Sequence, residues 1–399
     1  MNYEFPLIQH IDDVLPAIEG VDGFIVCKKD DFTIISYAFL SPELFGTAES
    51  ELDLNARIRR ECRGIAFDNV TGLIVSRPYH KFFNMGERVE TQEDVVSSKM
   101  NAAEYHLMDK MDGSMIRPIM VGNDYRLATK MGVTDIAMQA EKFVAAHPNY
   151  DKFIRSYLLG HCTPIFEWCS RQNRIVIDNG PKDSLVLTAV RQNDTGKYFH
   201  YYEMAYPFMR DYGIDIVRAS NNDGMMLITA EGIRNAASQL QESEGWVLRF
   251  ADGHMVKVKS EWYVLRHKSK DAITSEKEVV SMIANETIDD IKSFITDEDI
   301  KRIDAFQKKF WTGVREQVAY ITDRYTTIRA SGVDRKGFAL GEAQTMISFD
   351  KSFIFKMWDG CDAQELVVNA IKNSLGSREK LESARFLWGG HKWEYEFTE

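Results

Sequence analysis

The sequence predicts an α+β protein in which a strand-rich region, up to about residue 270, precedes an all-helical carboxy-terminal domain. Between Tyr105 and about Lys270, short half-apolar runs are separated by turn signals such as Gly122-Asn123-Asp124 and Asp252-Gly253. This pattern is typical of antiparallel hairpins. From Asp297 to Ala330, apolar residues recur every three or four positions, which is the period of an amphipathic helix.

The first hundred or so residues are predicted to be a mixed elaboration of the strand-rich region. Gly23 to Cys27 and Phe32 to Tyr37 are short β-type runs joined by a charged turn, and Ile65 to Phe67 pairs with Leu73 to Ser76 in a second hairpin. From Asn55 to Arg88 the chain carries seven Lys or Arg against three Asp or Glu. This local excess indicates either a bound polyanion or a solvated charged face.

The central region is predicted to be built on hairpins. Tyr105 to Asp109 alternates in polarity, as a half-buried strand does, and Asp112-Gly113 predicts a turn directly after Lys110. A hairpin should then return Lys130 close to the Lys110 loop. The remaining predicted elements are strands over 114–121, 125–130, 164–168 and 185–191 and a helix over 135–146.

Two capping patterns mark helix starts in the carboxy-terminal part. Thr296-x-x-Asp299 precedes the long periodic stretch, and Asp362-x-x-Glu365 precedes a second apolar run. We therefore expect a division into residues 1–270, with an elaboration over about 1–100, and a helical domain over 271–399.

Composition limits the function classes. The chain has 399 residues, 44% hydrophobic and 27% charged, which is ordinary for a soluble globular protein. No stretch approaches the ~18 apolar residues of a membrane span, and the amino terminus lacks a basic-then-apolar signal. Five scattered cysteines form no Cys-x-x-Cys pair, so neither a disulfide framework nor a zinc site is predicted. A cytoplasmic protein without membrane association follows as the expectation.

Lys110 is the candidate nucleophile. A lysine at the end of a strand is held in place, and its amine can attack an electrophile once burial or nearby cations favour loss of its proton. The four residues Lys110 to Gly113 form Lys-x-Asp-Gly, the nucleophile motif of ATP-dependent ligases and capping enzymes. A solvated lysine before a hairpin turn is the alternative, because such a short motif also occurs by chance.

The segment from Glu244 to Lys259 supplies charged groups for such a lysine. It is predicted to be a hairpin around Asp252-Gly253. If Phe250 pairs with Met255, strand alternation puts Glu244, Lys257 and Lys259 on one face, whereas a one-residue slip would send the lysines to the opposite face from Glu244. The alternative is the solvated side of an amphipathic hairpin.

These residues match the needs of nucleotidyl transfer. The reaction requires cations on the phosphate oxygens, a divalent metal held by carboxylates and an in-line nucleophile. Lys257 and Lys259 are the candidate cations, and Glu167 and Glu244 are the candidate carboxylates for magnesium or ribose. No Gly-x-x-x-x-Gly-Lys-Ser/Thr loop occurs, so a P-loop kinase is not predicted.

In order and spacing, these motifs resemble those of covalent nucleotidyltransferases. Further segments narrow the resemblance to the phage RNA ligase 1 family of ATP-dependent tRNA-repair ligases. The resemblance runs from about Tyr37 to about Asp290 and is carried by Lys110-Met111-Asp112-Gly113, Glu61-Cys62-Arg63-Gly64-Ile65, Lys81-Phe82-Phe83-Asn84, Phe166-Glu167, Asn173-Arg174-Ile175-Val176, Glu244-Gly245 and Lys257 to Tyr263. It implies a nucleotidyltransferase domain with ATP-grasp-like antiparallel sheets and helices, followed by the helical domain.

The resemblance also implies a role for each matching residue. Lys110 would carry AMP as a phosphoramidate, and Gly113 would permit its turn. Arg63, Lys81 and Tyr37 would hold the β- and γ-phosphates. Lys257 and Lys259 would neutralise the α-phosphate, with Gly245 beside them. The other implied contacts are Glu167 with ribose or a metal-bound water, Glu244 with metal, Lys130 with phosphate or adenylate, Tyr263 with the joining step and Asp289 (or its neighbour Asp290) with a second metal. For Phe83, core packing is an equal alternative, and for Asp289 a solvated helix start is the alternative.

The predicted function is ATP-dependent joining of 5′-phosphate and 3′-hydroxyl RNA ends, with Mg²⁺ or Mn²⁺. By family analogy the RNA is a tRNA broken in its anticodon loop, the helical domain docks it, and an end-healing kinase/phosphatase works alongside a monomeric ligase in the cytoplasm of a phage-infected host. Two alternatives stay open. A DNA ligase or capping enzyme would carry a β-rich OB domain after Lys259, and a non-enzymatic module would bind ATP or RNA without covalent chemistry.

Overall fold

In a computed structural model, the chain divides into two compact units, Met1–Val264 and Leu265–Glu399. We describe each unit by itself. The predicted boundary at residue 270 lies a few residues beyond this division, within one helix, α8 (Glu261–Thr274). The structure describes residues 3–38, 42–46, 53–171, 176–177, 180–203, 211–219 and 229–395. Three residues of the predicted Asn173-to-Val176 motif, 173–175, lie outside the described residues.

The first sheet of the larger unit is an antiparallel meander in the order β1-β2-β3-β4. Apolar side chains of β2 and β3, among them Ile35 and Ile65, pack against two short helices in a buried cluster. Both predicted hairpins of this region are present. The elements are η1 (Ile11–Asp13), α1 (Leu15–Ile18), β1 (Phe24–Lys28), β2 (Phe32–Tyr37), η2 (Pro42–Phe45), α2 (Leu54–Glu61), β3 (Arg63–Asp68) and β4 (Ile74–Ser76).

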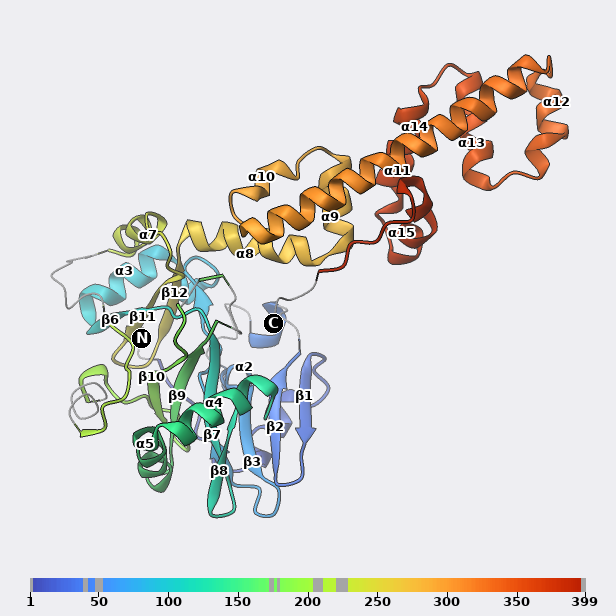
Figure 1. The fold of residues 1–399 in the computed structure, drawn as a ribbon. Coiled ribbons are helices and arrows are strands. Elements are labelled where there is room, and N and C mark those ends of the chain that lie inside the picture. Colours follow the sequence, from blue (N-terminus) through green and yellow to red (C-terminus); the bar gives the residue numbers. More distant parts are fainter. Residues whose placement is uncertain are drawn as a thin grey trace. The chain divides into compact units, whose positions relative to one another are not determined.

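The second sheet, named here the β9 sheet, has the order β10-β9-β7-β8 and is antiparallel throughout. Two helices cover one of its faces (Figure 1), where Phe166 and Trp168 of β9 join the largest buried cluster of the unit. The alternate residue, Glu167, therefore points to the other face. The elements are β7 (Ser114–Val121), β8 (Asp124–Ala128), α4 (Asp135–Ala146), α5 (Pro148–Leu159), β9 (Cys162–Cys169) and β10 (Ser184–Gln192).

The third sheet, named here the β11 sheet, has the order β5-β12-β11-β6, in which β5 runs parallel to β12. Helices α3 and α7 cover one face, packing on Leu107, Trp246 and Leu248. Side chains of opposite parity, including Met108 and Lys257, face away from these helices. The elements are β5 (Phe83–Asn84), η3 (Val89–Thr91), α3 (Glu93–Ala102), β6 (Tyr105–Asp109), α7 (Ala230–Ser238), β11 (Gly245–Phe250) and β12 (Met255–Lys259).

The β11–β12 hairpin corrects the predicted register. Met255 pairs with Arg249, so Lys257 lies opposite Val247 and Lys259 opposite Gly245. This is the one-residue slip considered above. With strict alternation along the strand, it would place Glu244 on the face opposite Lys257 and Lys259. Gly245 prevents that outcome, because its φ of +119° breaks the alternation at the first residue of β11. Glu244 therefore still reaches the lysines, although the reason differs from the predicted one.

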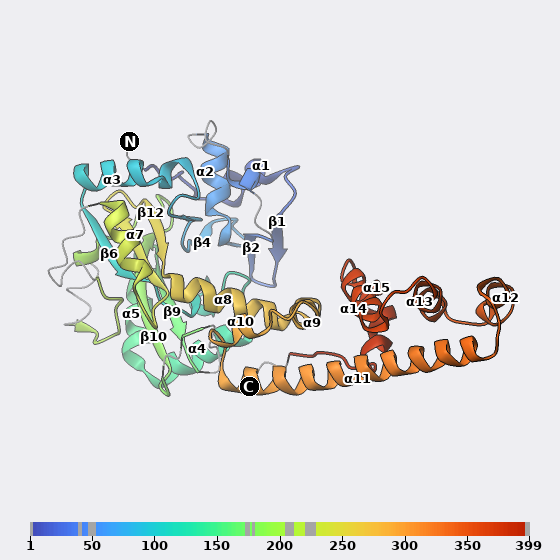
Figure 2. The same cartoon turned by 90° about the horizontal axis from the view of Figure 1, so that it is seen from above.

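In the described residues of the smaller unit, every regular element is a helix. Thr296 accepts a hydrogen bond from the Asp299 N–H, and Asp362 accepts one from the Glu365 N–H, as the capping patterns predict. The predicted helix over Asp297–Ala330 is α11, and α13 and α14 lie beside it (Figure 2) around a buried cluster that includes Phe310 and Trp388. Besides the end of α8, the elements are α9 (Glu276–Ala284), α10 (Asp289–Lys292), α11, α12 (Arg335–Leu340), η5 (Glu342–Gln344), α13 (Ser348–Trp358), α14 (Ala363–Ser374), α15 (Arg378–Ala384) and η6 (Arg385–Trp388).

These features match the predicted fold class, which is an α+β protein of antiparallel sheets with a helical carboxy-terminal part. No helix in the described residues combines the length and apolar character that crossing a membrane requires.

Candidate active site

The side chains that carry the predicted chemistry meet in a cavity of about 260 Å³ lined by both the β9 and the β11 sheets. Clefts with a few convergent polar groups on largely apolar walls are the usual form of ligand sites. Apolar residues such as Phe82, Met108 and Val247 line part of the cavity. The predicted site residues that line it are Arg63, Lys110, Gly113, Glu167, Lys257 and Lys259.

Lys110 follows the last residue of β6 directly. Its backbone N–H donates to the Gly245 carbonyl at 2.9 Å, which continues the β6–β11 ladder and fixes the lysine at the sheet edge. Its ammonium lies 2.6 Å from Glu244 Oε1, and the same oxygen is 3.5 Å from Lys259 Nζ. One buried carboxylate thus holds two lysine ammonium groups at the mouth of the cavity.

The turn after Lys110 is anchored by Asp112. This buried carboxylate accepts hydrogen bonds from the Val176 and Ile177 N–H groups, at 2.8 and 2.7 Å, and from the Tyr263 hydroxyl at 2.7 Å. Gly113 is required next to it, because a Cβ there would lie 2.3 Å from the Trp168 carbonyl oxygen. Residues far apart in the sequence therefore fix the direction in which Lys110 points.

Lys257 is the most strongly perturbed cation of the cavity. Burial, aided by the charges of Arg63, Lys81, Lys110 and Lys259, lowers the pKa of Lys257 to about 6. Its ammonium also lies 4.8 Å from the centroid of the Phe82 ring. A lysine that is costly to charge among like charges is stabilised by an anion, so this position suits a phosphate.

Glu167 faces Lys110 from the β9 sheet. Burial raises the pKa of Glu167 to about 7, with Glu244 adding to the rise and Lys110 opposing it. Glu167 lines the cavity, and Glu244 lies behind two of its lysines, close enough to repel Glu167. Two carboxylates that repel one another fit a hard divalent cation, which prefers oxygen ligands. Glu167 and Glu244 are therefore the residues that would hold a magnesium or manganese ion.

Four other predicted residues form a cluster: Tyr37, Lys81, Phe83 and Lys130. Arg60, which the sequence did not single out, belongs to the same cluster. Lys130 Nζ donates to the Tyr37 carbonyl at 3.2 Å and lies 4.1 Å from the centroid of the Tyr37 ring. Burial lowers the pKa of Lys81 to about 8, helped by Arg63, Arg88 and Lys130 although Glu87 opposes the shift. Rings and cations alternate here: Lys81, Arg60 and Arg88 lie 5.0, 5.2 and 4.7 Å from the Phe83 ring centroid.

This cluster gives Phe83 a physical role that the sequence left open. Its ring is 4% exposed and packs with Leu44 and Phe45, so it is a core residue. The same ring also offers its face to three cations, and cation–π contacts of this kind are worth about 0.5–1 kcal/mol each when exposed and more when desolvated. Packing and cation placement are thus both functions of Phe83.

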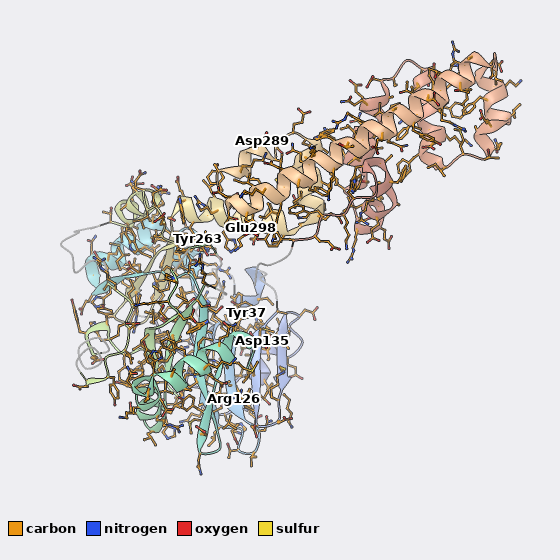
Figure 3. The ribbon with its side chains drawn as sticks, viewed as in Figure 1. Tyr37, Arg126, Asp135, Tyr263, Asp289 and Glu298 are labelled. Atoms are coloured by element: carbon orange, nitrogen blue, oxygen red, sulfur yellow. The ribbon has the colours of Figure 1, made fainter. Side chains whose placement is uncertain are left out.

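Asp289 belongs to the helical unit and stands in the first turn of α10 (Figure 3). Its side chain is 74% exposed and pairs with Lys292 at 2.6 Å, the arrangement of a solvated helix start. Its predicted metal contact stays a prediction.

A second cavity, of about 630 Å³, lies along α11 in this unit, and its charged lining residues are one arginine and one aspartate, Arg315 and Asp323.

Sequence reasoning missed two residues that shape the site. Asp112 was read as a turn former, and its anchoring role depends on partners 64 and 151 positions away. Arg249 lines the cavity from β11 and donates to the Phe199 carbonyl. Strand parity could have found it, because Arg249 and Lys257 share one face once the register is known.

In the described residues, the architecture is an α+β fold with three four-stranded sheets and a lysine at a sheet edge that lines a charged cavity. Two family models match the chain: one described as RNA ligase over residues 61–263, and one described as T4 RNA ligase 1, C-terminal domain, over residues 270–378. A protein of Thermovibrio ammonificans, provisionally named an RNA ligase, is 30% identical over 315 residues, covering 76% of each chain.

Other relatives share smaller parts. RNA ligase 1 of bacteriophage TS2126 is 26% identical over 122 residues, covering 30% of this chain and 29% of that protein. A protein of Autographa californica nuclear polyhedrosis virus, provisionally named a bifunctional polynucleotide kinase/RNA ligase, is 24% identical over 282 residues, covering 66% of this chain and 39% of that protein. A solved archaeal ATP-dependent RNA ligase superposes with a TM-score of 0.45 at 11% identity, covering 77% and 79% of the two chains.

The chain belongs to the RNA ligase family of the T4 RNA ligase 1 type.

Proposed function

We propose that the ligase works through a lysyl-AMP intermediate on Lys110 and joins 5′-phosphate to 3′-hydroxyl RNA ends. The observation that carries this proposal is the placement of the Lys110 ammonium, partly buried and 2.6 Å from Glu244, in a cavity shared with Lys257 and Lys259. A nucleophile, a proton acceptor and phosphate-binding cations are thus within one nucleotide-sized space.

In the first step, the neutral amine of Lys110 attacks the α-phosphorus of ATP. An N–P bond forms, and the P–O bond to pyrophosphate breaks. The proton that the ammonium must first lose has an acceptor within hydrogen-bond distance, the Glu244 carboxylate. Arg63 on the cavity wall and Lys81 in the neighbouring cluster are proposed to bind the β- and γ-phosphates and so draw pyrophosphate away, with Tyr37 and Lys130 supporting them.

Lys257 and Lys259 are proposed to neutralise the α-phosphate, where negative charge accumulates during transfer. A divalent cation, when bound, would supply further charge neutralisation on the phosphate oxygens. Glu167 and Glu244 would hold it, and Glu167 also lies where a ribose hydroxyl could reach it. Gly245 keeps Glu244 within reach of both lysines.

In the second step, the 5′-phosphate of the RNA attacks the lysyl-AMP. The N–P bond breaks, Lys110 regains its proton, and a pyrophosphate linkage joins AMP to the RNA end. In the third step, the 3′-hydroxyl of the other end attacks the RNA phosphorus, its proton leaves, a 3′–5′ phosphodiester forms and AMP departs. Tyr263 is proposed to support RNA joining, and its hydrogen bond to Asp112 also fixes the turn that holds Lys110 for the first two steps.

For the substrate, we propose a tRNA broken in its anticodon loop, bound with the help of the helical unit. The match of residues 270–378 to the C-terminal domain of T4 RNA ligase 1 supports a shared role for that unit. The ligase can join two ends only if one carries a 5′-phosphate and the other a 3′-hydroxyl. A kinase/phosphatase that prepares cleaved ends in this form is therefore the proposed partner. The viral relative, whose name joins a polynucleotide kinase to an RNA ligase, supports this pairing.

A joining assay with two kinds of donor tests the proposal. With ATP, Mg²⁺ and 5′-phosphate RNA, the wild-type protein should join the ends, and Lys110→Ala should not. With RNA that already carries AMP on its 5′ end, Lys110→Ala should still join, because the third step does not use the lysine. Lys142→Ala is the matched control, since this lysine is exposed on α4 and should behave as wild type with both donors.

Other outcomes would contradict the proposal. Joining of 5′-phosphate RNA by Lys110→Ala would exclude the lysine as nucleophile. A wild-type protein that binds ATP and RNA but joins neither donor would indicate a binding module. Sealing of nicked DNA in preference to RNA would overturn the proposed substrate, and equal joining of linear RNA and broken tRNA would overturn the proposed tRNA selection.

A further inference from the structure

A second group of side chains of metal-binding type lies around His106, four residues before Lys110. His106 is on β6, Glu104 precedes this strand and His200 comes from the segment after β10. Each offers one ligand atom, and these atoms all lie within 4.8 Å of one another. Glu104 Oε1 is 3.8 Å from His106 Nε2, and Glu104 Oε2 is 3.4 Å from His200 Nε2.

The imidazole of His106 lacks the partners that a buried polar group normally has. The residue is 4% exposed, and neither ring nitrogen has a hydrogen-bond partner among the described residues. Most buried polar side-chain atoms are hydrogen-bonded, since leaving one unsatisfied costs about 1–3 kcal/mol. The rings of His200, Tyr201 and Tyr202 surround it at centroid distances of 5.1, 5.1 and 5.0 Å. A ligand on Nε2 would satisfy the nitrogen that faces Glu104.

We propose that Glu104, His106 and His200 bind one divalent transition-metal ion of the zinc type, with water as the fourth ligand. A tetrahedral zinc ion with bonds of about 2.1 Å separates its ligand atoms by roughly 3.4 Å. Glu104 Oε1 lies 3.8 Å from His106 Nε2, and Glu104 Oε2 lies 3.4 Å from His200 Nε2, each close to this value. With one ligand atom per residue, the three atoms lie within 4.8 Å of one another, so a bound ion must draw the side chains slightly together. The side chains of His200 and Glu104 are 27% and 57% exposed, whereas His106 is buried, so we expect these two side chains to make the small movement that closes the site.

The donor set distinguishes this site from the catalytic one. Imidazole nitrogen with a carboxylate suits zinc, whereas magnesium prefers oxygen ligands such as those of Glu167 and Glu244. Glu104 is exposed, which gives an ion and its water access from solvent. The positive charge of Arg249 would oppose a cation here, because Arg249 of β11 is the register partner of His106 on β6. Its guanidinium, however, is engaged by the Phe199 carbonyl and the Tyr198 ring.

Metal at this point would fasten the His200 segment to β6, the strand that ends at Lys110. That segment is already joined to the β9 sheet by the hydrogen bond from Phe199 N–H to the Val190 carbonyl, and to β11 by the bond from Arg249 to the Phe199 carbonyl; the metal would add a link to β6. The proposed role is therefore to brace the two sheets that line the cavity. It does not depend on the covalent chemistry proposed above.

The test is a zinc titration of the full chain in excess Mg²⁺, read by competition with a chromophoric chelator. Wild type should bind one zinc ion tightly. His200→Ala and Glu104→Gln should each lower the affinity at least about 100-fold, because each removes a ligand. His267→Ala is the matched control, as His267 forms an exposed two-residue pair with Asp271 at 2.9 Å and should leave tight binding unchanged.

Thermal melting separates metal binding from misfolding. Without zinc, His200→Ala should melt as wild type does, and zinc should raise the melting temperature of wild type but not of the variant. Tight zinc binding that survives in both His200→Ala and Glu104→Gln would overturn the proposal. So would a wild-type affinity no higher than that of the two variants.

Discussion

Lys257 shows how single residues of the cavity are prepared for an anion. Its depressed pKa results from burial and from the four cations around it, so in the unliganded protein much of its charge is lost at neutral pH. A bound phosphate reverses the balance, because it favours the ammonium form. Nucleotide binding and proton uptake are therefore coupled at this residue.

The first prediction concerns pH. With a pKa of about 6 that rises on binding, Lys257 should take up close to one proton per nucleotide at pH 7, and nucleotide affinity should fall as pH rises above about 6. Calorimetry in two buffers of different ionisation enthalpy measures this uptake. Lys257→Met should bind nucleotide more weakly and without most of the uptake, while Lys142→Met should match wild type. Undiminished proton uptake by Lys257→Met would refute the coupling.

Among the structural elements, the β11–β12 hairpin matters most for the site, and it also marks a limit of sequence reasoning. The sequence predicted the hairpin, the shared face of Lys257 and Lys259 and the nearness of Glu244. Its register was wrong by one residue, because an Asp-Gly turn does not by itself fix the loop length. Gly245 restores the arrangement through a backbone conformation that no periodicity reveals.

The second prediction tests that glycine. In Gly245→Ala, the added Cβ would lie 2.1 Å from the Val258 carbonyl oxygen, at a φ of +119°. We expect a loss of about 2–4 kcal/mol in unfolding free energy together with a large loss of RNA joining. Gly122→Ala is the control, because Gly122 has a φ of +60° with nothing within 4 Å of its Cβ position. Chemical denaturation measures the unfolding free energy of both variants. An equal loss of unfolding free energy in Gly245→Ala and Gly122→Ala would contradict the contact argument.

At the scale of the whole larger unit, a buried ion cluster joins segments that are distant in sequence. Glu61 at the end of α2 pairs with Arg77 at 3.1 Å and with Arg191 of β10 at 2.7 Å, and all three are at most 2% exposed. Burial opposes ionisation, but the two arginines hold the pKa of Glu61 below its ordinary value. The cluster links the first sheet to the β9 sheet. Glu61 itself lies two residues before Arg63, which lines the cavity.

The third prediction follows from this cluster. Glu61→Ala leaves two buried guanidinium groups without their carboxylate, which should cost about 3–5 kcal/mol in unfolding free energy. Glu298→Ala removes an exposed partner of Arg302 in the helical unit (Figure 3) and should cost no more than about 1 kcal/mol. Denaturant midpoints compare the two. A loss at Glu61 as small as that at Glu298 would show that the cluster does not hold the unit together.

The separation along the sequence between two contacting residues decides whether the sequence could predict their contact. The α11 helix and its cap at Thr296 were predicted to the residue, because periodicity and capping are local. Lys110, Glu167 and Lys257 were recognised through motifs, and the structure brings them into one cavity. The bond from Tyr263 to Asp112 and the approach of His200 to Glu104 join residues about 150 and 100 positions apart, so only the folded chain reveals them.

The most direct test of the central claim is covalent labelling. The protein is incubated with Mg²⁺ and ATP labelled at the α-phosphate, then denatured and digested. Label should survive denaturation, be lost in acid as expected of an N–P bond, and map to the peptide that contains Lys110; Lys110→Ala should carry none. Label on a different residue, or undiminished label in Lys110→Ala, would contradict the claim.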